Sequence, residues 1–523
     1  MDYKVLITTS GIGSRLGEIT KYTNKCLVRI GTKPAISYII DNYPTKTKFV
    51  ITLGYFGNYV KDFLELAYPE KSFEFVNVKK YAGEGSSLLV SLLEAEKNLQ
   101  IPFIYHVCDN ITLDKIPEPE HNWISGYNNR DSSSYASISL SGKKVIDIHK
   151  KGHMNFDLLH TGLIGINDFK RFWEIANKIN IEKPTDSTLG DVDVLKQQIN
   201  IDDFKVVKLK TWFDIGSISG LNLSRKKLSN NEYEVLDKLA ESIFKIDNYI
   251  IKFFSDSKLS TNRVDRKFYL KDNIPEIIDS RDNFFKYKYV EGKLFSHYAN
   301  RKNFIGLIKW SENNLWKPIE DVDYNKFKND CKLFYYDKTT SRINDFHLKK
   351  NIEDKENIIN DEKIPKLKDL LKDVDFDELT QDKPTHFHGD FILDNIIQIN
   401  ENEFKLIDWR QDFSGNLEAG DMYYDLAKLS HNLVVNHGII DKNLFQIEIK
   451  KDKIRVNINR IQTLVECEKL YFEYLKNNNY NIKKIKLLRA IIWLNMSPLH
   501  HHPFDNFLYY FGKYELYNAL KNE

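Results

Sequence analysis

The stretch Ile7–Val28, ITTSGIGSRLGEITKYTNKCLV, joins a short apolar segment to a loop that contains three glycines. Glycine has no Cβ atom, so the backbone N–H groups of such a loop can approach a phosphate closely. Arg15 adds a planar fork of donors and Lys25 adds a point charge, and both suit a triphosphate. The stretch therefore predicts a strand, a phosphate-binding loop and a helix, in that order.

Two common glycine loops do not fit this stretch. A Walker loop needs a second glycine, followed by lysine, five residues after its first, but the residue five after Gly11 is Leu16. A dinucleotide fingerprint needs its third glycine at that same position. A plain glycine turn with solvated Arg15 and Lys25 side chains remains as an alternative.

The composition predicts a globular chain of two or more domains, because 523 residues exceed one ordinary core and 42% of them are apolar. The formal net charge of +2 gives no reason to expect a nucleic-acid or membrane partner. The start of the chain does not resemble a signal peptide, and no apolar run reaches the roughly 18 residues of a membrane helix. The four cysteines are far apart, which favours reduced thiols over disulfides or zinc. We therefore expect a cytoplasmic protein.

Strand and helix patterns alternate over about the first 225 residues, which predicts an α/β domain with a mainly parallel, doubly wound sheet. The pattern changes after TWFDIGS, residues 211–217, and the polar segment Ser224–Glu234 is a predicted linker or bridging helix. We place the domain boundary so that residues 1–228 and 229–523 form separate domains. In the second domain we expect residues 349–382 to be exposed and partly helical, and long amphipathic helices from Val456 onward.

Several ordered motifs of the first domain resemble those of sugar-phosphate nucleotidylyltransferases. GIGSRL is followed by TNKCLVRIGTKPAISYII, and further matches are IYHVCDN, the segment IDIHKKGHMNFDLLHTGLIGI and TWFDIGS. The sequence departs from that family at Thr9-Ser10, where alanines are usual, at Asn24 in place of proline, and at Lys150 in place of glutamate. The resemblance implies a Rossmann-like fold of the GT-A type.

The resemblance also implies the role of each site residue. Asp109 and Asp214 would bind Mg²⁺, while Arg15 and Lys25 would neutralise the β- and γ-phosphates of a nucleoside triphosphate. Lys151, with a register uncertain by one residue from Lys150, would contact the sugar phosphate. The remaining candidates line the triphosphate loop, the base-recognition loop and the pocket wall: Gly11, Gly13 and Ser14; Gly83, Gly85 and Ser86; and Thr161 and Gly162.

The second half contains THFHGDFILDNIIQINENEFKLIDWRQDF, residues 385–413. Transfer of a phosphoryl group to an alcohol needs an acid near the hydroxyl, together with an amide and a second acid on Mg²⁺. The stretch resembles the aminoglycoside phosphotransferase and choline kinase family, which implies an α+β, bilobal, protein-kinase-like domain. In that case Asp390 would orient the hydroxyl, Asn395 and Asp408 would bind Mg²⁺, and Asp425 in GDMYYDLAKL would be structural.

The amino-terminal part of that second domain matches the kinase family less well. Lys252 would be the strand lysine on the ATP phosphates, and residues 287–292 would be the hinge over adenine. No glycine-rich loop precedes Lys252, and no helix glutamate is evident as its partner. A binding module without turnover therefore stays open beside an active kinase.

Two other features carry no functional prediction. The run His500-His501-His502 is read as a turn between helices, or as part of the acceptor pocket together with Trp493, Asn495 and Asp505, and not as a metal site. The aromatic tail FLYYFGKYELY is read as packed core or as the face of a homo-oligomer.

The two resemblances together predict a bifunctional enzyme. The second domain would phosphorylate a sugar, polyol or amino alcohol with ATP, and the first would couple that phosphate ester to CTP, UTP or GTP and release pyrophosphate. The motifs of the first domain favour a sugar, while choline or ethanolamine with a cytidylyltransferase is the alternative. The product would be an activated building block for a surface polysaccharide or a lipid headgroup.

Overall fold

The structure, a computed structural model, describes residues 2–129, 131–228 and 238–521. It is a mixed α/β protein with two compact units. The first unit consists of residues 1–260 with 278–287, and the second of residues 261–277 with 288–523. The predicted linker falls partly outside the described residues. The first unit continues past residue 228 and includes strands from the segment that follows the linker.

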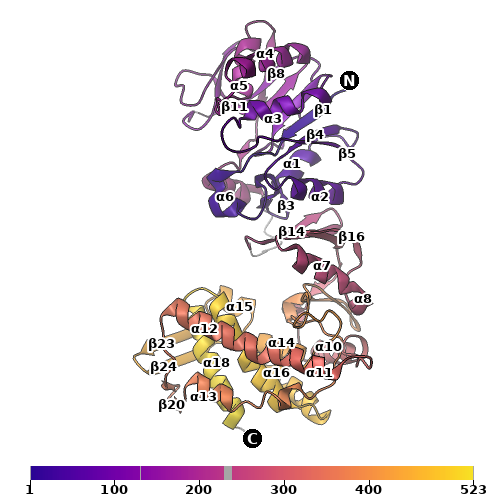
Figure 1. Cartoon of the computed structure of the whole chain (residues 1–523), viewed down its shortest axis with the longest axis vertical. Helices are drawn as coiled ribbons and strands as arrows, with labels where there is room; N and C mark the ends of the chain where they lie inside the picture. The colour runs from indigo at the N-terminus through magenta and orange to yellow at the C-terminus, as the bar shows by residue number, and fades with distance from the viewer. Residues whose placement is uncertain (1, 130, 229–237, 522–523) are drawn as a thin grey trace. The chain divides into compact units, whose positions relative to one another are not determined.

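A nine-stranded sheet forms the centre of the first unit (Figure 1). β1, β4, β5 and β6 are mutually parallel, whereas β11 runs antiparallel to both β6 and β8, so the sheet is mixed where the sequence predicted a mainly parallel one. The nine residues of β11 are all buried, and a continuous buried run does not reveal the direction of a strand. The strand order is β5 (Ser72–Asn77), β4 (Lys48–Leu53), β1 (Lys4–Thr8), β6 (Phe103–Val107), β11 (Leu158–Ile166), β8 (Trp123–Tyr127), β12 (Phe204–Leu209), β10 (Lys144–His149) and β9 (Ser137–Ser141).

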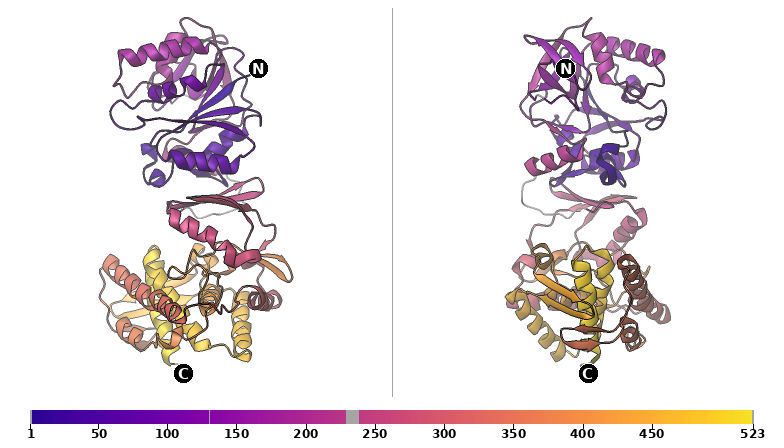
Figure 2. Two further views of the ribbon diagram at one scale, coloured as in Figure 1. Left: turned by 45° about the vertical axis from the view of Figure 1, so that its right-hand side comes forward. Right: turned by 90° about the vertical axis from the view of Figure 1, so that its left-hand side faces the viewer.

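Helices cover both faces of this sheet, as predicted (Figure 1; Figure 2). Alternate residues of a strand point to opposite faces. Val5 and Ile7 of β1 therefore pack with α1 (Ala35–Asp41) and α2 (Gly57–Ala67). Leu6 packs on the other face, with α3 (Leu88–Glu94), α4 (Phe169–Glu182) and α5 (Asp191–Gln198).

A second, four-stranded sheet packs on α2 within the first unit. Its strands, in spatial order, are β14 (Glu241–Ile246), β15 (Tyr249–Phe254), β17 (Phe284–Lys288) and β16 (Ile277–Arg281). The rings of Phe63 and Phe244 lie 5.3 Å apart and those of Tyr59 and Phe253 lie 5.1 Å apart. Lys286 Nζ donates to Leu66 O at 2.8 Å, at the end of α2. Side chains of this small sheet and of α2 thus share one hydrophobic core.

The second unit is mainly helical and carries two small sheets. Their orders are β18 (Lys293–Leu294), β21 (Ile396–Asn400), β22 (Glu403–Leu406), and β20 (Glu362–Ile364), β19 (Asn357–Ile359), β24 (Lys453–Ile458), β23 (Phe445–Lys450). Its longer helices are α10 (Arg301–Asn314), α12 (Lys338–Lys350), α14 (Met422–Val434), α16 (Gln462–Asn477), α17 (Ile482–Met496) and α18 (Phe504–Lys521).

Two sequence predictions for this unit can be compared with its elements. The long helices after residue 456 are present, but residues 349–382 contain the hairpin of β19 and β20, whose Ile359 and Ile364 are fully buried. The segment is therefore less exposed than predicted. In the aromatic tail, Phe507, Leu508 and Tyr509 of α18 are buried inside the unit, as expected of packed core.

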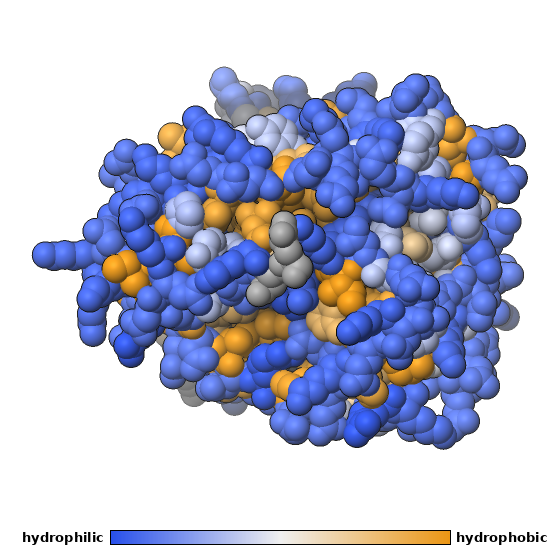
Figure 3. Space-filling model, turned by 90° about the horizontal axis from the view of Figure 1, so that it is seen from below, coloured by the Kyte–Doolittle hydropathy of each residue, from blue (hydrophilic) through white to orange (hydrophobic). Residues whose placement is uncertain are grey.

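Hydrophilic side chains cover most of the face of the second unit that Figure 3 shows, with apolar side chains between them. Among the described residues, no helix combines the length and the apolar character needed to span a bilayer.

Candidate active sites

The glycine loop of the first unit is held against the backbone that carries Lys25. Gly13 has φ +71°, and a Cβ there would lie 3.0 Å from Lys25 Cβ, so the close approach requires glycine. Ser14 begins a short helical segment, η1 (Ser14–Thr20), and is exposed, as is Arg15. Gly11 has open space around it. The predicted strand and loop are present, but a 3₁₀ segment stands where a longer helix was expected.

Asn24, which replaces the proline of the resembling family, is completely buried and clamps this loop. Its side-chain amide donates to Thr9 O at 2.8 Å and to Tyr55 O at 2.6 Å, and its Oδ1 accepts from Cys26 N at 3.0 Å. This last contact caps η2 (Lys25–Leu27). Asn24 therefore ties the end of β1, the start of α2 and the Lys25 turn together, and it has a structural function.

Replacing Asn24 with alanine is expected to destabilise the first unit by about 1–3 kcal/mol, because buried carbonyls would lose their donors. Chemical denaturation followed by circular dichroism measures this loss. Asn200→Ala is the control, since Asn200 is exposed and makes one local hydrogen bond. Equal stability of the two variants would show that the hydrogen bonds of Asn24 do not stabilise the loop.

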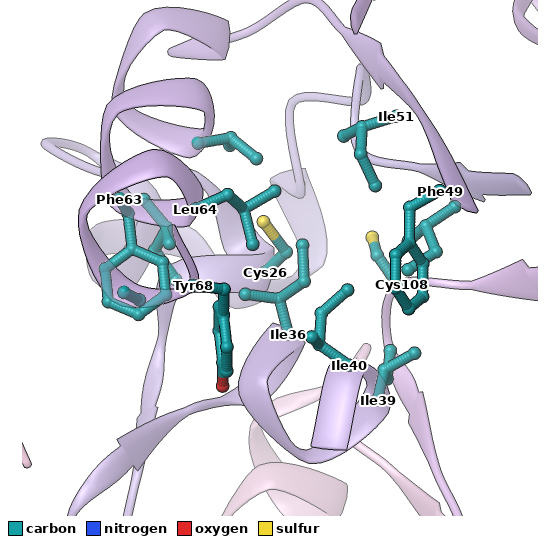
Figure 4. Close-up of a cluster of buried hydrophobic side chains, with 14 of the residues drawn as sticks. Cys26, Ile36, Ile39, Ile40, Phe49, Ile51, Phe63, Leu64, Tyr68 and Cys108 are labelled. Atoms are coloured by element: carbon teal, nitrogen blue, oxygen red, sulfur yellow. The ribbon is translucent and has the colours of Figure 1, made fainter. Parts of the chain in front are cut away.

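The cysteines next to two candidate residues anchor them in the core. Cys26 follows Lys25 and Cys108 precedes Asp109 in the chain. Both thiols are fully buried, and Figure 4 shows them among the side chains of Ile36, Ile40 and Leu64 in a hydrophobic cluster. The neighbouring Lys25 and Asp109 meet each other beside Cys108, so packing of the core sets their position.

Asp109 and Asp214, 105 positions apart in the chain, are brought together by a two-stranded antiparallel sheet. Asp109 lies in the turn between β6 and β7 (Asn110–Ile111), and Asp214 ends β13 (Phe213–Asp214), which pairs with β7. Ile215 N also donates to Asp109 O at 2.9 Å. Both carboxylates are thereby directed to the same place at the end of the parallel strands.

Gly216 marks the point where the charged groups converge. A Cβ on this residue would lie 2.9 Å from Arg15 Nη2, 3.0 Å from Asp109 Oδ2 and 3.1 Å from Asp214 Oδ1. Asp214 Oδ1 accepts from Gly216 N at 2.9 Å. Only glycine fits between these groups, and two carboxylates and a guanidinium therefore surround one small volume.

Lys25 and Asp109 form the electrostatic centre of this site. Their Nζ and Oδ2 atoms lie 2.9 Å apart, and Arg15 Nη2 is 3.9 Å from the same oxygen. Burial opposes the charge on each partner, but their mutual attraction and hydrogen bond outweigh it. The pKa of Lys25 is therefore raised and the pKa of Asp109 is lowered, so both groups stay ionised around neutral pH.

Tyr135 also belongs to this site, and sequence reasoning missed it. Its hydroxyl donates to Asp214 Oδ2 at 2.8 Å, and its ring packs edge-on against Trp212 at 4.8 Å. Burial and the Asp214 carboxylate both raise the pKa of Tyr135, so the phenol keeps its proton and remains a donor. No motif identifies this tyrosine, since it lies in the polar segment before β9.

Replacing Tyr135 with phenylalanine is expected to raise the Mg²⁺ concentration needed for half-maximal nucleotidyl transfer about 10-fold or more, because the carboxylate would lose the donor that orients it. A magnesium titration of the steady-state rate measures this. Tyr127→Phe, which also packs on Trp212, should leave the titration unchanged. Identical curves for both variants would show that Tyr135 does not orient Asp214 for metal binding.

The other predicted residues of the first unit lie in different surroundings. Gly83 and Gly85 both have positive φ, and Ser86 Oγ donates to Gly83 O at 2.6 Å within an exposed turn. Gly162 has φ +72°, and a Cβ there would lie 2.6 Å from Val107 Cγ2. The adjacent Thr161 is buried, and its carbonyl accepts from Asn110.

The sequence left two lysines, Lys150 and Lys151, as candidates for contact with the sugar phosphate. Lys150 pairs with Asp193 at 2.8 Å, whereas Lys151 is exposed and has no ion pair among the described residues. The contact of Lys151 with the sugar phosphate stays a prediction.

In the second unit, Asp390, Asn395 and Asp408 come together around one loop. Asn395 Nδ2 donates to Asp390 O at 2.9 Å and to Asp390 Oδ2 at 3.1 Å. Ile407 N donates to Asn395 O at 2.9 Å, which places Asp408 beside Asn395 at the end of the β21–β22 hairpin. Arg263 lies 3.4 Å from Asp408. The three predicted residues therefore form one polar site.

Asp425 and Arg266 hold the backbone of this loop. Asp425 accepts from the backbone N–H groups of His388 and Gly389, each at 2.7 Å. Burial raises the pKa of Asp425 to about 6 although these donors act against the shift. The buried Arg266 guanidinium donates to the carbonyls of Phe387 and His388. These contacts are those of a structural residue, the role expected of Asp425; Arg266 was not anticipated from the sequence.

Lys428 is a further member of the second site that the sequence prediction omitted. Its Nζ lies 2.7 Å from Asp390 Oδ1. Burial opposes ionisation of Asp390, but the Lys428 charge outweighs it and lowers the pKa of that carboxyl. Lys428 follows Asp425 by three positions on α14, so both residues face the same loop. This spacing within GDMYYDLAKL was a usable signal in the sequence.

The remaining predicted residues are divided between the units. Lys252 on β15 belongs to the first unit, where it is 2% exposed, and residues 287–292 span the boundary between the units. Asn495 donates to Thr339 Oγ1 at 2.7 Å, and the buried Asp505 pairs with Lys350, so both have structural partners. Within the described ranges, no group of three or more histidine, cysteine, aspartate or glutamate residues is placed to hold a metal ion. Residues 500–502 lie between η8 (Ser497–Leu499) and α18.

No protein-family model matches the chain, and the comparison with curated proteins found no match. Among solved structures, it is similar to a CTP:phosphocholine cytidylyltransferase from Streptococcus pneumoniae, with 18% identity over 44% of this chain and 100% of that chain and a TM-score of 0.37. A UDP-glucose pyrophosphorylase bound to UDP-glucose shows 17% identity over 43% of this chain and 98% of that chain, with a TM-score of 0.37. The inositol-1-phosphate CTP transferase from T. maritima shows 15% identity over 43% of this chain and 97% of that chain, with a TM-score of 0.35.

Proposed function

We propose that the first unit is a nucleotidylyltransferase, which joins a nucleoside triphosphate to a phosphate ester and releases pyrophosphate. The observation that carries this proposal is the convergence of Arg15, Asp109 and Asp214 around Gly216, with Lys25 bound to Asp109. Two acids and two cations at the end of a glycine loop suit a reaction in which negative charge develops on phosphate oxygens.

In this reaction a phosphate oxygen of the ester attacks the α-phosphorus while the bond to the leaving pyrophosphate breaks. Arg15 is 58% exposed at the mouth of the site and can turn toward a triphosphate, where its charge stabilises the leaving group. Lys25 is held by Asp109 and contributes a fixed charge that needs no reorganisation. Lys151 is the candidate for the phosphate of the ester. No strong base is required, because the attacking oxygen is already ionised.

The donor set of this site fits Mg²⁺. Asp109 and Asp214 each place a carboxylate oxygen about 3 Å from the same point beside Gly216. Magnesium is usually held by one or two carboxylates together with phosphates and water, so a third protein ligand is not needed. When bound, the ion would neutralise charge on the triphosphate and align it. Tyr135 would fix the orientation of Asp214.

We also propose that the second half of the chain phosphorylates an alcohol with ATP, which makes the protein bifunctional. Asp390 accepts hydrogen bonds from Asn395 and Lys428 and stays ionised, as suits a group that orients a hydroxyl. Asn395 and Asp408 offer the oxygen ligands for Mg²⁺, and Lys252 is the candidate for the ATP phosphates. A non-catalytic binding module is the alternative.

The two activities form a sequence, since the phosphate ester made by one is the substrate of the other. The acceptor would be a sugar, polyol or amino alcohol, and the second nucleotide CTP, UTP or GTP. We infer a cytoplasmic enzyme that acts on small molecules and not on nucleic acid or membranes. Activation of choline or ethanolamine with CTP is the second candidate.

A mass-spectrometric screen of the full-length protein tests this function. CTP, UTP and GTP are each incubated with phosphorylated sugars, polyols and amino alcohols, and Asp390→Asn protein isolates the first reaction. A nucleoside diphosphate product with pyrophosphate supports the proposal. Adding ATP with unphosphorylated acceptors to the wild-type protein then tests the coupled reaction. The bifunctional proposal fails if no acceptor consumes ATP.

A further inference from the structure

A cluster of positive side chains begins beside Asp390 in the second unit. This cationic cluster consists of Lys338 and Arg342 on α12, Arg410 in the segment after β22, and Lys428 on α14. Lys428 contacts Asp390 directly at 2.7 Å. Arg410 lies against the same loop, because a Cβ on Gly389 would be 2.6 Å from Arg410 Cβ. Two separate segments, α14 and the one after β22, thus bring positive charge to this carboxylate, and α12 adds two cationic side chains near Arg410.

Phe334 connects the remaining members of the cluster. The Nζ atom of Lys338 lies 3.8 Å from the centre of the Phe334 ring, and the guanidinium carbon of Arg410 lies 4.8 Å from it. Arg342 follows Lys338 by four positions on α12, and its Nη1 donates to Asn495 O at 3.2 Å. The ring face stabilises cations but supplies no negative charge to neutralise them.

Three members of the cluster have no carboxylate partner. Within the part of the chain that the structure describes, Lys338, Arg342 and Arg410 make no ion pair within 4.0 Å, and Arg410 Nε donates to a backbone carbonyl, Asp412 O, at 3.1 Å. Elsewhere in this unit a buried lysine is neutralised, since Lys484 pairs with both Asp382 and Asp421 at 2.6 Å. One of the four members is thus neutralised by a direct ion pair, the one between Lys428 and Asp390, while Asp412 and Asp345 act on the others without such a contact.

This charge has a cost in the absence of a ligand. Burial first, and then the neighbouring Arg410, Arg342 and Lys428, lower the pKa of Lys338 to about 5. An anion at the cluster would remove that penalty and allow Lys338 to take up a proton. Besides its own members, the charged and titratable groups that face the cluster are Asp345, Asp390, Asp412, Tyr424 and His431.

We propose that the cationic cluster binds an anionic group of the alcohol that Asp390 orients, so that the acceptor is a hydroxycarboxylate or a phosphate ester with a free hydroxyl. The proposal rests on the kinase function proposed for this half. Asn395 contacts Oδ2 of Asp390 while Lys428 contacts Oδ1, so the cluster and the proposed metal ligand approach the carboxylate through different oxygens. This arrangement assigns the cluster to the acceptor and not to ATP.

The reaction that follows is balanced without another reactant. The acceptor oxygen bonds to the γ-phosphorus of ATP, the bond to the β-phosphate oxygen breaks, ADP leaves, and the hydroxyl proton is released through Asp390. The product carries both its original anionic group and a new phosphate. A quaternary ammonium acceptor such as choline fits this cluster poorly, because Arg342, Arg410 and Lys428 would repel a cation.

The test compares four acceptors with the full-length protein: glycerate as hydroxycarboxylate, glycerol 3-phosphate as phosphate ester, glycerol as neutral match and choline as cation. We expect ATP consumption with one of the two anions to exceed that with glycerol at least tenfold, and the better anion identifies the class. Lys338→Met should raise KM for that anion about tenfold with KM for ATP unchanged. The exposed Lys349→Met, on the same helix, is the control.

Two further readouts separate the possible failures. KM for the anion should rise with pH between 6 and 8 in the wild type, because binding takes up a proton, and this slope should vanish in Lys338→Met. If Lys338→Met raised KM for ATP instead, the cluster would bind ATP and the proposal would be wrong. Faster ATP consumption with choline or glycerol than with either anion would also overturn it. If no acceptor supports turnover, binding of each anion is measured by calorimetry. Binding to the wild type but not to Lys338→Met would support the anion site and reject only the kinase function. Absence of binding to the wild type would reject both the anion site and the kinase function.

Discussion

Asp109→Asn is expected to reduce the rate of nucleotidyl transfer by roughly 10²–10³-fold, because it removes a charge at the point where the acids and cations of the first unit converge. The carboxylate pairs with Lys25 at 2.9 Å and, with Asp214, offers the oxygen ligands for Mg²⁺. Asparagine keeps the size of the side chain but cannot balance the Lys25 charge. Pyrophosphate release with the triphosphate selected by the screen measures the effect.

The exposed Asp203→Asn is the matched control for this experiment, since its carboxylate is 83% exposed and pairs only with Lys144 at the surface. Asp214→Asn provides a second variant in case the loss of charge beside Lys25 weakens the fold. A folded Asp109→Asn or Asp214→Asn protein with the wild-type rate would show that the reaction takes place elsewhere. Thermal melting monitored by circular dichroism establishes which variants are folded.

Asp390→Asn is expected to lower ATP-dependent phosphorylation of the acceptor by about 10²–10⁴-fold while leaving the nucleotidyl-transfer reaction unchanged. Asp390 is ionised and is held between Asn395 and Lys428, so an amide would lose both its charge and the Lys428 ion pair. ADP release with the best acceptor measures the first reaction, and pyrophosphate release from a supplied phosphate ester measures the second.

This variant carries its own internal control, because Asp390 lies in the second unit while Asp109 and Asp214, the acids proposed for nucleotidyl transfer, lie in the first. The exposed Asp373→Asn in the second unit is an additional control. Retained phosphorylation in Asp390→Asn would remove Asp390 from the reaction. Loss of both activities would indicate a general defect in folding and would require Lys428→Met, which leaves the carboxylate in place, as a milder second variant.

Local sequence patterns were informative where the structure depends on neighbours in the chain. The strand and glycine loop around residues 7–28 are present, because a short apolar run and backbone freedom at Gly13 are local properties. The triad of Asp390, Asn395 and Asp408 also comes together, since a short loop and one hairpin are enough to join it. Such contacts span few residues, so the spacing in the chain already restricts their geometry.

Contacts between distant segments were not predictable in the same way. Tyr135 and Asp214 are 79 positions apart, and Arg266 reaches carbonyls more than 120 positions away. No pattern in the sequence indicated that the small sheet of β14–β17 would share a core with α2. Its apolar residues predict strands, but they do not specify which apolar surface the strands pack against. The antiparallel direction of β11 likewise follows from pairing with β6 and β8 and not from its own residues.

The sequence by itself determined the order of the elements, the glycine loop and the kinds of chemical group available, because these depend on residue type and short spacing. The tertiary structure alone decided that Asp109 and Asp214 meet at Gly216, that Asn24 clamps the loop instead of merely replacing a proline, and that Lys338, Arg342 and Arg410 gather near the Lys428–Asp390 ion pair. The physical reason is that burial and strand pairing join segments whose separation in the chain carries no local signal.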